Sequence, residues 1–478
     1  MRPRLPDGLV AFVKRECATC KLVAPVLRAL REGGQRLTVY TQDDPAFPEG
    51  LTPLDDTSLE ASWQHQIETV PTLLRVKDGA EAARTVGWSR ERWEALTGAT
   101  GLGPLLPGMR PGCGSLSVDP DRVDELAVRF AAGKLRSRLV ELAPLEDEIE
   151  TAFERGWTDG LPVVPPTQAR VLRMLTGTSR ASDEVVAVVP PDLSPATVEK
   201  IAVNAVMAGC KPEHLPVVLA ALEAACTDQF NMHGVLATTM PVGPVVIVNG
   251  PIRRAIGMNS GVNVLGQGNR AGLTIGRALQ LIVRNLGGGR PGEVDRATHG
   301  SPGKLSFCFA EDEEGSPWEP LSVERGFARG KSTVTLFAGE GTRCVVDQKS
   351  RTPESLAATF ALALRGVSHS KLAMAFDAIL VVGPDHARVF GEAGWSRARL
   401  LDELSARLQL PGSELVRGAG GIAEGLPEHF RDLLVPKFRP GGLLLVHAGG
   451  GAGLFSEIIG GWVSGDGGSQ PITREITP

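Results

Sequence analysis

Two cysteines near the start of the chain, Cys17 and Cys20, have the spacing C-x-x-C and constrain the fold more than any other feature. An apolar run at residues 9–13 precedes them and a helical pattern at residues 21–27 follows, which predicts strand, turn and helix. A cysteine at the start of a helix lies beside unpaired N–H groups and the positive end of the helix dipole, and both favour the thiolate. We therefore predict that Cys17 is the attacking thiol and is more exposed than Cys20, which would resolve the mixed disulfide.

A proline at position 71 marks a second motif, Thr-Val-Pro-Thr, which a strand-like run and a Lys-Asp-Gly turn follow. The pattern suits a cis-proline at Pro71 that faces the dithiol. Together with the C-x-x-C, Lys21 after it and the helix proline Pro25, this motif resembles the thioredoxin family over residues 9–96. The resemblance implies a thioredoxin-like fold and thiol–disulfide exchange. The alternative is half of a zinc site, for which this region offers only His65 as a further ligand.

The composition is that of a globular chain. With 478 residues, 42% hydrophobic and 22% charged, it is long enough for two or three domains with substantial cores. A net charge of -5 argues against a nucleic-acid surface. No window reaches membrane-spanning length, and the first residues lack the apolar region of a signal peptide. Seven scattered cysteines are an odd number, which disfavours a secreted disulfide framework, so we expect a cytoplasmic protein.

Glycine and proline at residues 97–104 predict a boundary, so residues 1–98 are expected to form the thioredoxin-like domain. Residues 99–155 are expected to form a linker and a helical segment, with Cys113 in the sequence Pro-Gly-Cys-Gly-Ser. Two interpretations of Cys113 stay open. It is a plain linker cysteine, or it is an exposed thiol on a mobile arm that passes electrons from the dithiol to the next domain. The second interpretation predicts that mild oxidation crosslinks Cys113 to the dithiol.

Helices and strands alternate over residues 156–478, which predicts a larger α/β domain that carries the catalytic site. Residues 194–251 and 351–384 echo each other, each with a helix start, a strand and a Gly-Pro turn, which suggests internally duplicated halves. This region also resembles an uncharacterised bacterial family in which some members are selenoproteins with a U-G-S-C motif. The passages that carry the resemblance are residues 156–167, 204–212, 302–327 and 384–396.

In that resemblance Cys113-Gly114-Ser115 would occupy the selenocysteine-glycine-serine positions, and Leu116 stands where the last cysteine belongs. The resemblance implies a reactive chalcogen at Cys113 and supplies no substrate.

Residues 259–276 are the best candidate for a small-molecule site, because amide side chains alternate with glycines just ahead of a helix. Glycines allow close approach, and the amides and helix N–H groups can hold an anion or carboxylate. The candidate substrate-binding residues are Asn259, Asn263, Gln267, Gly268, Asn269, Arg270 and, from another passage, His233. The alternative is a packed glycine turn. A second glycine-rich run at residues 448–453 could cradle phosphate or carboxylate, or form a C-terminal lid.

Cys308 lies in a predicted strand whose alternation places Phe307 and Phe309 on the opposite face. Four acidic residues follow at positions 311–314, as they would at a nucleophile or metal site, although acidic runs are commonly solvated surfaces.

Three functions fit these features. The first is a thiol-dependent oxidoreductase in which the dithiol, with Pro71, Cys113 and Cys308 as further catalytic candidates, relays electrons or sulfur to the small-molecule site. A thioredoxin or glutathione system would supply the reductant, and the chain could form a homo-oligomer. The second is a zinc- or iron–sulfur-dependent lyase or hydratase with Cys210, Cys308 and His233 as ligands, although their spacing matches no compact ligand set. The third is an adaptor that docks by thiol exchange, which the polar, glycine-rich loops disfavour.

Overall fold

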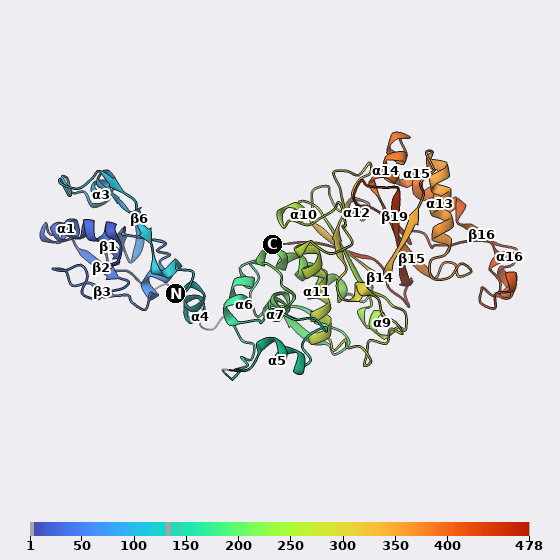
Figure 1. Cartoon of the computed structure of the whole chain (residues 1–478), viewed down its shortest axis with the longest axis horizontal. Coiled ribbons are helices and arrows are strands. Elements are labelled where there is room, and N and C mark those ends of the chain that lie inside the picture. The colour runs from blue at the N-terminus through green and yellow to red at the C-terminus, as the bar shows by residue number, and fades with distance from the viewer. Residues whose placement is uncertain (1–3, 131–134, 144, 478) are drawn as a thin grey trace. The chain divides into compact units, whose positions relative to one another are not determined.

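The computed structural model describes residues 4–130, 135–143 and 145–477. The chain divides into two compact units, an N-terminal unit at Met1–Lys134 and a C-terminal unit at Leu135–Pro478 (Figure 1). The expected linker and helical segment at residues 99–155 is shared between them, and Cys113 lies inside the N-terminal unit.

The N-terminal unit is a mixed sheet with helices packed on it. The strand order is β3-β2-β1-β5-β6, with β1 at Gly8–Val13, β2 at Leu37–Thr41, β3 at Leu54–Asp55, β5 at Thr72–Lys77 and β6 at Ala80–Val86. The central strand β1 pairs parallel with β2 and antiparallel with β5. Helices of this unit are α1 (Ala18–Glu32), α2 (Glu60–Gln64), α3 (Arg90–Thr97) and α4 (Val123–Phe130), with a 3₁₀ turn at Leu116–Val118.

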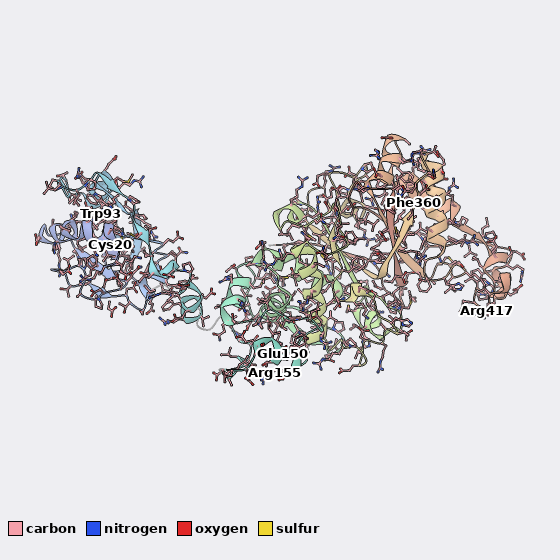
Figure 2. The ribbon with its side chains drawn as sticks, in the orientation of Figure 1. Cys20, Trp93, Glu150, Arg155, Phe360 and Arg417 are labelled. Carbon is pink, nitrogen blue, oxygen red and sulfur yellow. The ribbon has the colours of Figure 1, made fainter. Side chains whose placement is uncertain are left out.

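The order of β1, turn and α1 is as the sequence predicted. Residues 9–13 are all buried, because β1 has neighbours on both edges and side chains packed on both faces. The buried side of α1 repeats every three or four residues, as at Val23, Leu27 and Leu30. Cys20 and Trp93 lie in the core of this unit (Figure 2). The fold therefore holds the dithiol at the end of a buried strand.

Two short antiparallel pairs complete the N-terminal unit. Strand β4 (Thr69–Val70) pairs with β9 (Cys113–Gly114), and β7 (Trp88–Ser89) pairs with β8 (Met109–Arg110). The Val70–Pro71 peptide bond is cis, as predicted.

The C-terminal unit is mixed α/β, in agreement with the predicted fold class. Its sheet has the order β13-β12-β14-β19-β15-β18, and β20 also pairs with β14. The strands are β12 (Gly243–Asn249), β13 (Cys308–Ala310), β14 (Thr333–Val346), β15 (Phe376–Val382), β18 (Leu443–His447), β19 (Phe455–Val463) and β20 (Ile472–Glu475).

The same pairing pattern occurs twice in this sheet. Strand β12 pairs parallel with β13 and antiparallel with β14, and β15 pairs parallel with β18 and antiparallel with β19. The antiparallel β14–β19 pair joins the halves. A threonine-capped helix precedes each half, α7 (Val198–Ala208) after Thr197 and α13 (Pro353–Arg365) after Thr352. This topology agrees with the duplication expected from the sequence.

Successive side chains of the strands point to opposite faces of the sheet, and each face packs against its own apolar layer. Ile247 and Val381 pack in one central cluster, whereas Val248 and Val382 point the other way into helix-covered clusters. The covering helices are α7, α8 (Leu215–Ala225) and α11 (Arg270–Asn285) on the first half, and α13, α14 (Pro384–Glu392) and α15 (Arg397–Arg407) on the second. Phe360 of α13 lies in the second of these layers (Figure 2).

The two edge strands of this sheet approach each other. The N–H of Asp312, which follows β13, donates to the carbonyl of His447 in β18 at 2.8 Å. Arg397 donates to the β18 carbonyl of Leu445 and pairs with Glu311. The sheet therefore curls until residues after one edge strand contact the other.

Smaller elements fill the rest of the C-terminal unit. They are α5 (Glu148–Glu154), α6 (Gln168–Leu175), β10 (Val185–Val189), β11 (Ser194–Thr197), α9 (Met232–Ala237), α10 (Ile252–Ala255), α12 (Leu321–Glu324), β16 (Gln409–Pro411), α16 (Gly412–Leu415), β17 (Leu434–Pro436) and 3₁₀ turns at Pro212–His214, Pro302–Lys304, Ala419–Gly421 and Glu428–Phe430. Among the described residues, no helix combines the length and apolar character needed to cross a membrane.

Candidate functional site

Three cysteines meet at the start of α1. Cys17 is the cap residue of this helix, and its Sγ accepts a hydrogen bond from the backbone N–H of Cys20 at 3.4 Å. The Cys17 Sγ lies 2.8 Å from the Sγ of Cys113 and 3.4 Å from the carbonyl oxygen of Val70. Because Val70 directly precedes Pro71, the predicted proline lies beside the dithiol, where the sequence placed it.

Strand pairing brings Cys113 to the dithiol. In the antiparallel β4–β9 pair, Cys113 is opposite Val70. One residue earlier, a Cβ on Gly112 would overlap Thr69 Cγ2 and would lie 2.7 Å from the carbonyl oxygen of Val70. Glycine at position 112 therefore permits the close approach of β9 to β4.

Further hydrogen bonds hold residues 109–117, here called the covering segment, on both sides of Cys113. On one side, the hydroxyl of Thr19 donates to the carbonyl of Pro111 at 2.7 Å. On the other side, the amide of buried Gln42 donates to Ser115 Oγ at 2.6 Å and accepts from the N–H of Leu116 at 3.0 Å. Sequence reasoning missed the contacts of Thr19, an inner residue of the C-x-x-C motif, and of Gln42, because no local pattern signals a hydrogen bond to so distant a part of the chain.

The electrostatics place the negative charge on Cys17. Hydrogen bonding from the Cys20 thiol lowers the pKa of Cys17 to about 5; burial opposes this shift, and the Cys113 thiol and backbone N–H groups add to it. Burial, and then the hydrogen bond to Cys17, raise the pKa of Cys20 and the pKa of Cys113. At neutral pH the site therefore holds one thiolate, at Cys17, between two thiols.

The covering segment overturns one expectation. Cys17 and Cys20 both have 0% of their surface exposed, so the prediction that Cys17 is the more exposed of the two is wrong. Cys113 is half-buried and is the most accessible of the three. It lies in a paired strand rather than on a mobile arm. All seven cysteines of the chain are free thiols in this structure.

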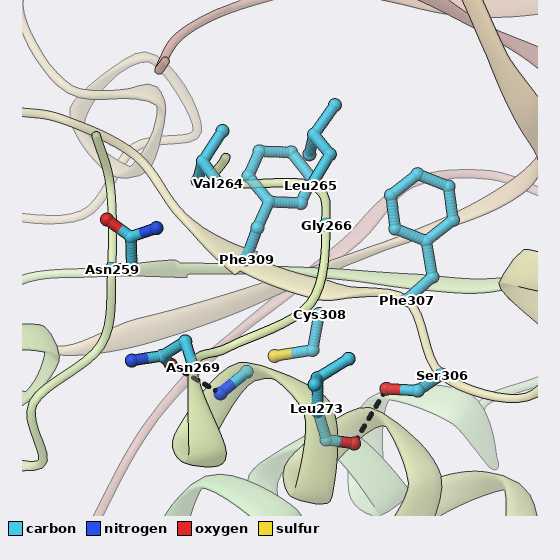
Figure 3. Close-up of a pocket in the computed structure, with 11 residues that line it drawn as sticks. Asn259, Val264, Leu265, Gly266, Asn269, Leu273, Ser306, Phe307, Cys308 and Phe309 are labelled. Carbon is cyan, nitrogen blue, oxygen red and sulfur yellow. Dashed lines mark hydrogen bonds between the residues drawn. The ribbon is translucent and has the colours of Figure 1, made fainter. Parts of the chain in front are cut away.

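The second candidate site is a small pocket in the C-terminal unit at the start of α11 (Figure 3). Three predicted site residues line it, Asn259, Asn269 and Cys308. The cavity volume is about 20 Å³, which is room for about one water molecule. A cavity of this size does not admit a metabolite, so the small-molecule site stays a prediction.

The loop amides near this pocket already have partners. Asn259 Nδ2 donates to the carbonyl of Val262, and Asn263 Nδ2 donates to the carbonyl of Gln267. Asn269 Nδ2 donates to the carbonyl of Gly257, and its Oδ1 accepts from Gly272 N–H to cap α11. These contacts are those of the packed glycine turn that the sequence analysis left open as the alternative.

Other predicted binding residues lie outside the pocket lining. Asn263, Gln267, Gly268 and Arg270 are exposed, and the Arg270 guanidinium donates to the carbonyl of Gly209. His233 is exposed on α9.

The two glycine-rich runs of this unit lie against each other. The N–H of Gly449 donates to the carbonyl of Ser260 at 2.9 Å. A Cβ on Gly450 would lie 2.6 Å from Val262 Cγ2. The C-terminal run therefore packs on the loop at residues 259–262, a contact that neither run signals by itself.

Cys308 is buried at the start of β13, against α11. A Cβ on Gly276 of this helix would lie 2.9 Å from the N–H nitrogen of Phe307 and 3.2 Å from Cys308 Cβ. Burial raises the pKa of Cys308, and the neighbouring Cys210 adds to this shift. Burial likewise raises the pKa of Cys210 to about 12. Both groups are therefore thiols at neutral pH.

The acidic run after Cys308 is partly internal. Glu311 is fully buried, accepts from Asn249 Nδ2 at 2.6 Å and pairs with Arg397, while Glu313 and Glu314 pair with Arg253. In the part of the chain that the structure describes, no group of three or more His, Cys, Asp or Glu side chains could hold a metal ion.

Sequence comparisons match only the N-terminal part of the chain. It is 32% identical over 79 residues to a thioredoxin of Chlamydia trachomatis serovar D, covering 16% of this chain and 67% of that protein. It is 33% identical over 79 residues, with the same coverage, to a thioredoxin of Chlamydia muridarum strain MoPn / Nigg. No protein-family model matches the chain. Neither relative extends over residues 156–478, so the family of that region is not shown.

Proposed function

Because the N-terminal unit of this chain belongs to the thioredoxin family, we propose that Cys17 and Cys20 are a thiol–disulfide exchange centre that works through Cys113. The 2.8 Å separation of the Cys17 and Cys113 sulfurs carries this proposal. The lowered pKa of Cys17 supports it, because the thiolate is the nucleophile in disulfide exchange.

The exchange has three steps. Cys113 first loses its proton and exchanges with a substrate disulfide, which releases one half of the substrate as a thiol and leaves the other half bound to Cys113 as a mixed disulfide. The Cys17 thiolate then attacks the Cys113 sulfur, which forms a Cys17–Cys113 disulfide and releases the second half of the substrate as a thiol. Cys20 then loses its proton and attacks Cys17, which leaves a Cys17–Cys20 disulfide and a free Cys113 thiol. An external dithiol reductant supplies the two electrons that reduce the Cys17–Cys20 disulfide and start the next cycle.

The C-terminal unit would bind the small molecule to which this centre passes electrons or sulfur. The pocket at α11 supports this part of the proposal, because Asn259, Asn269 and Cys308 meet there at the start of a long helix. A substrate would enter only after the loop at residues 259–266 opens, since the cavity of about 20 Å³ holds about one water. Cys308, a buried thiol, would shape this pocket rather than attack.

Trapping the Cys17–Cys113 intermediate tests the exchange. The full chain with Cys20→Ser, oxidised with diamide, should accumulate a Cys17–Cys113 disulfide, because the resolving thiol is gone; peptide mapping would identify it. The matched control is the same chain with Cys20→Ser and Cys113→Ser, which should leave Cys17 free. A Cys17 that remains reduced in the first protein, or pairs with another cysteine, would contradict the proposal.

A further inference from the structure

The covering segment points to a control on the exchange centre, and this inference rests on the proposed function. We propose that residues 109–117 are a tethered client strand, that is, a segment of the same chain that occupies the place of a polypeptide substrate. Until it is displaced, this segment keeps the disulfides of other polypeptides away from the dithiol. Cys113 is the cysteine of this built-in client.

The segment is bound as an extended peptide that adds to a strand edge. It pairs through β9 with β4 and through β8 with β7, so that backbone hydrogen bonds hold it on both sides of Gly112. Strand addition of this kind gives affinity through the main chain and places one side chain in a defined position. Here the placed side chain is Cys113, 2.8 Å from Cys17.

The fit leaves no room for a second peptide at the same edges. A Cβ on Gly87, next to β7, would lie 2.9 Å from the backbone nitrogen of Gly112. With the segment in place Cys17 has 0% of its surface exposed. A polypeptide disulfide therefore reaches Cys17 only after the segment has left, whereas a small disulfide can exchange at the half-buried Cys113.

Two glycines of the covering segment, Gly112 just before β9 and Gly114 within it, give a matched pair of variants. Gly112→Ala introduces a Cβ that would overlap Thr69 Cγ2 and approach the Val70 carbonyl, and should displace the segment without removing a cysteine. Gly114→Ala, two residues along, introduces a Cβ with nothing within 4 Å, and should leave the segment in place. Neither glycine has a positive φ, so backbone strain does not separate the two changes.

The experiment measures two activities of the full chain with dithiothreitol as reductant. One substrate is insulin, a polypeptide disulfide, and the other is hydroxyethyl disulfide. In each case Cys17 and Cys20 give two electrons to the substrate disulfide, become a disulfide and are reduced again by dithiothreitol. We expect Gly112→Ala to reduce insulin at least about tenfold faster than the wild type, because the binding-competent state becomes populated. Gly114→Ala should match the wild type on both substrates.

The outcomes separate this inference from the proposed function. Equal insulin reduction by the wild type and Gly112→Ala, with hydroxyethyl disulfide reduced by both, would overturn the tethered client and leave the exchange centre standing. Reduction of neither substrate by any variant would overturn the proposed function itself. If circular dichroism shows that Gly112→Ala is not folded, Gln42→Ala is used in its place. That variant removes the hydrogen bonds to Ser115 and Leu116 and should give a smaller rise in insulin reduction; no rise would overturn the inference.

Discussion

Two helices of this chain begin beside a cysteine, and the two helix starts use their cap positions differently. At α1 the cap residue is Cys17, so the sulfur itself accepts the N–H at the helix start. At α11 the cap is Asn269, whose carbonyl oxygen accepts Gly272 N–H, and Cys308 packs against the side of the helix. Only the first arrangement directs the helix N–H groups at a sulfur.

Burial does not distinguish these two cysteines. Cys17 is 0% exposed and Cys308 is 9% exposed, yet the pKa of Cys17 is lowered to about 5 and the pKa of Cys308 is raised. Burial disfavours the thiolate in both cases, and only Cys17 has the thiol and N–H donors that reverse the effect. Donors placed around a sulfur, rather than its exposure, decide which of these two cysteines is a thiolate at neutral pH.

The largest expected difference between the two sites is catalytic. Cys17→Ser should lower the reduction of hydroxyethyl disulfide to the uncatalysed level, because a serine hydroxyl cannot form the mixed disulfide. Cys308→Ser should reduce this substrate at the wild-type rate. Steady-state assays of both variants with dithiothreitol would check this. A large loss in Cys308→Ser would show that the second cysteine takes part in exchange, and the comparison would fail.

The pH dependence should follow the same contrast. Since the pKa of Cys17 is lowered, its thiolate forms as the pH rises through about 5 and is complete at neutral pH, whereas Cys308 stays a thiol until alkaline pH. NMR titration of the cysteine Cβ signals would measure both. Cys20→Ala should raise the pKa of Cys17 more than Cys113→Ala, because the Cys20 thiol is the largest cause of the shift. The reverse order would mean that Cys113 is the principal donor.

Local signals in the sequence were enough to predict the elements around the dithiol and the two faces of the strand that contains Cys308. The apolar run at residues 9–13 and the helical pattern at residues 21–27 predicted that a strand and a helix would flank Cys17, and period-two alternation separated Phe309 from Cys308. One of the two interpretations of Cys113 placed it near the dithiol, but no local signal predicted its pairing with Val70, because this pairing joins distant parts of the chain. Gly112 is the residue of the local sequence that the contact requires, but one glycine beside a cysteine does not identify the partner strand.

The loop at residues 259–276 illustrates a second limit. Amides and glycines ahead of a helix predicted a small-molecule site, and Asn259 and Asn269 line a cavity of about 20 Å³, which is room for about one water molecule. Composition does not reveal whether an amide faces a ligand or its own loop, and here Asn263 donates to the carbonyl of Gln267 four residues later. Asx-type hydrogen bonds of this kind compete with ligand binding for the same atoms.

Packing against α11 gives a smaller expected effect. Gly276→Ala would place a Cβ 2.9 Å from the backbone nitrogen of Phe307, so β13 must shift. We expect this overlap to lower the free energy of unfolding of the C-terminal unit by about 1–3 kcal/mol, although alanine otherwise favours a helix. Urea unfolding against Gly451→Ala, whose Cβ has nothing within 4 Å, would measure the difference. A more stable Gly276→Ala would show that Cys308 is not tightly packed against this helix.

The smallest expected effect distinguishes the two uses of a cap residue. Asn269→Ala removes the acceptor for Gly272 N–H and should lower the free energy of unfolding by about 1 kcal/mol. Asn269→Asp keeps that acceptor and loses only the bond to the carbonyl of Gly257, so its free energy of unfolding should lie within about 0.5 kcal/mol of the wild type. If the pocket binds anions at the start of α11, Asn269→Asp should also abolish any stabilisation by inorganic phosphate in thermal unfolding, because its carboxylate would repel the anion. Phosphate that stabilises the wild type and Asn269→Asp equally would mean that Asn269 is only a cap, and that α11, unlike α1, has no chemical role at its first turn.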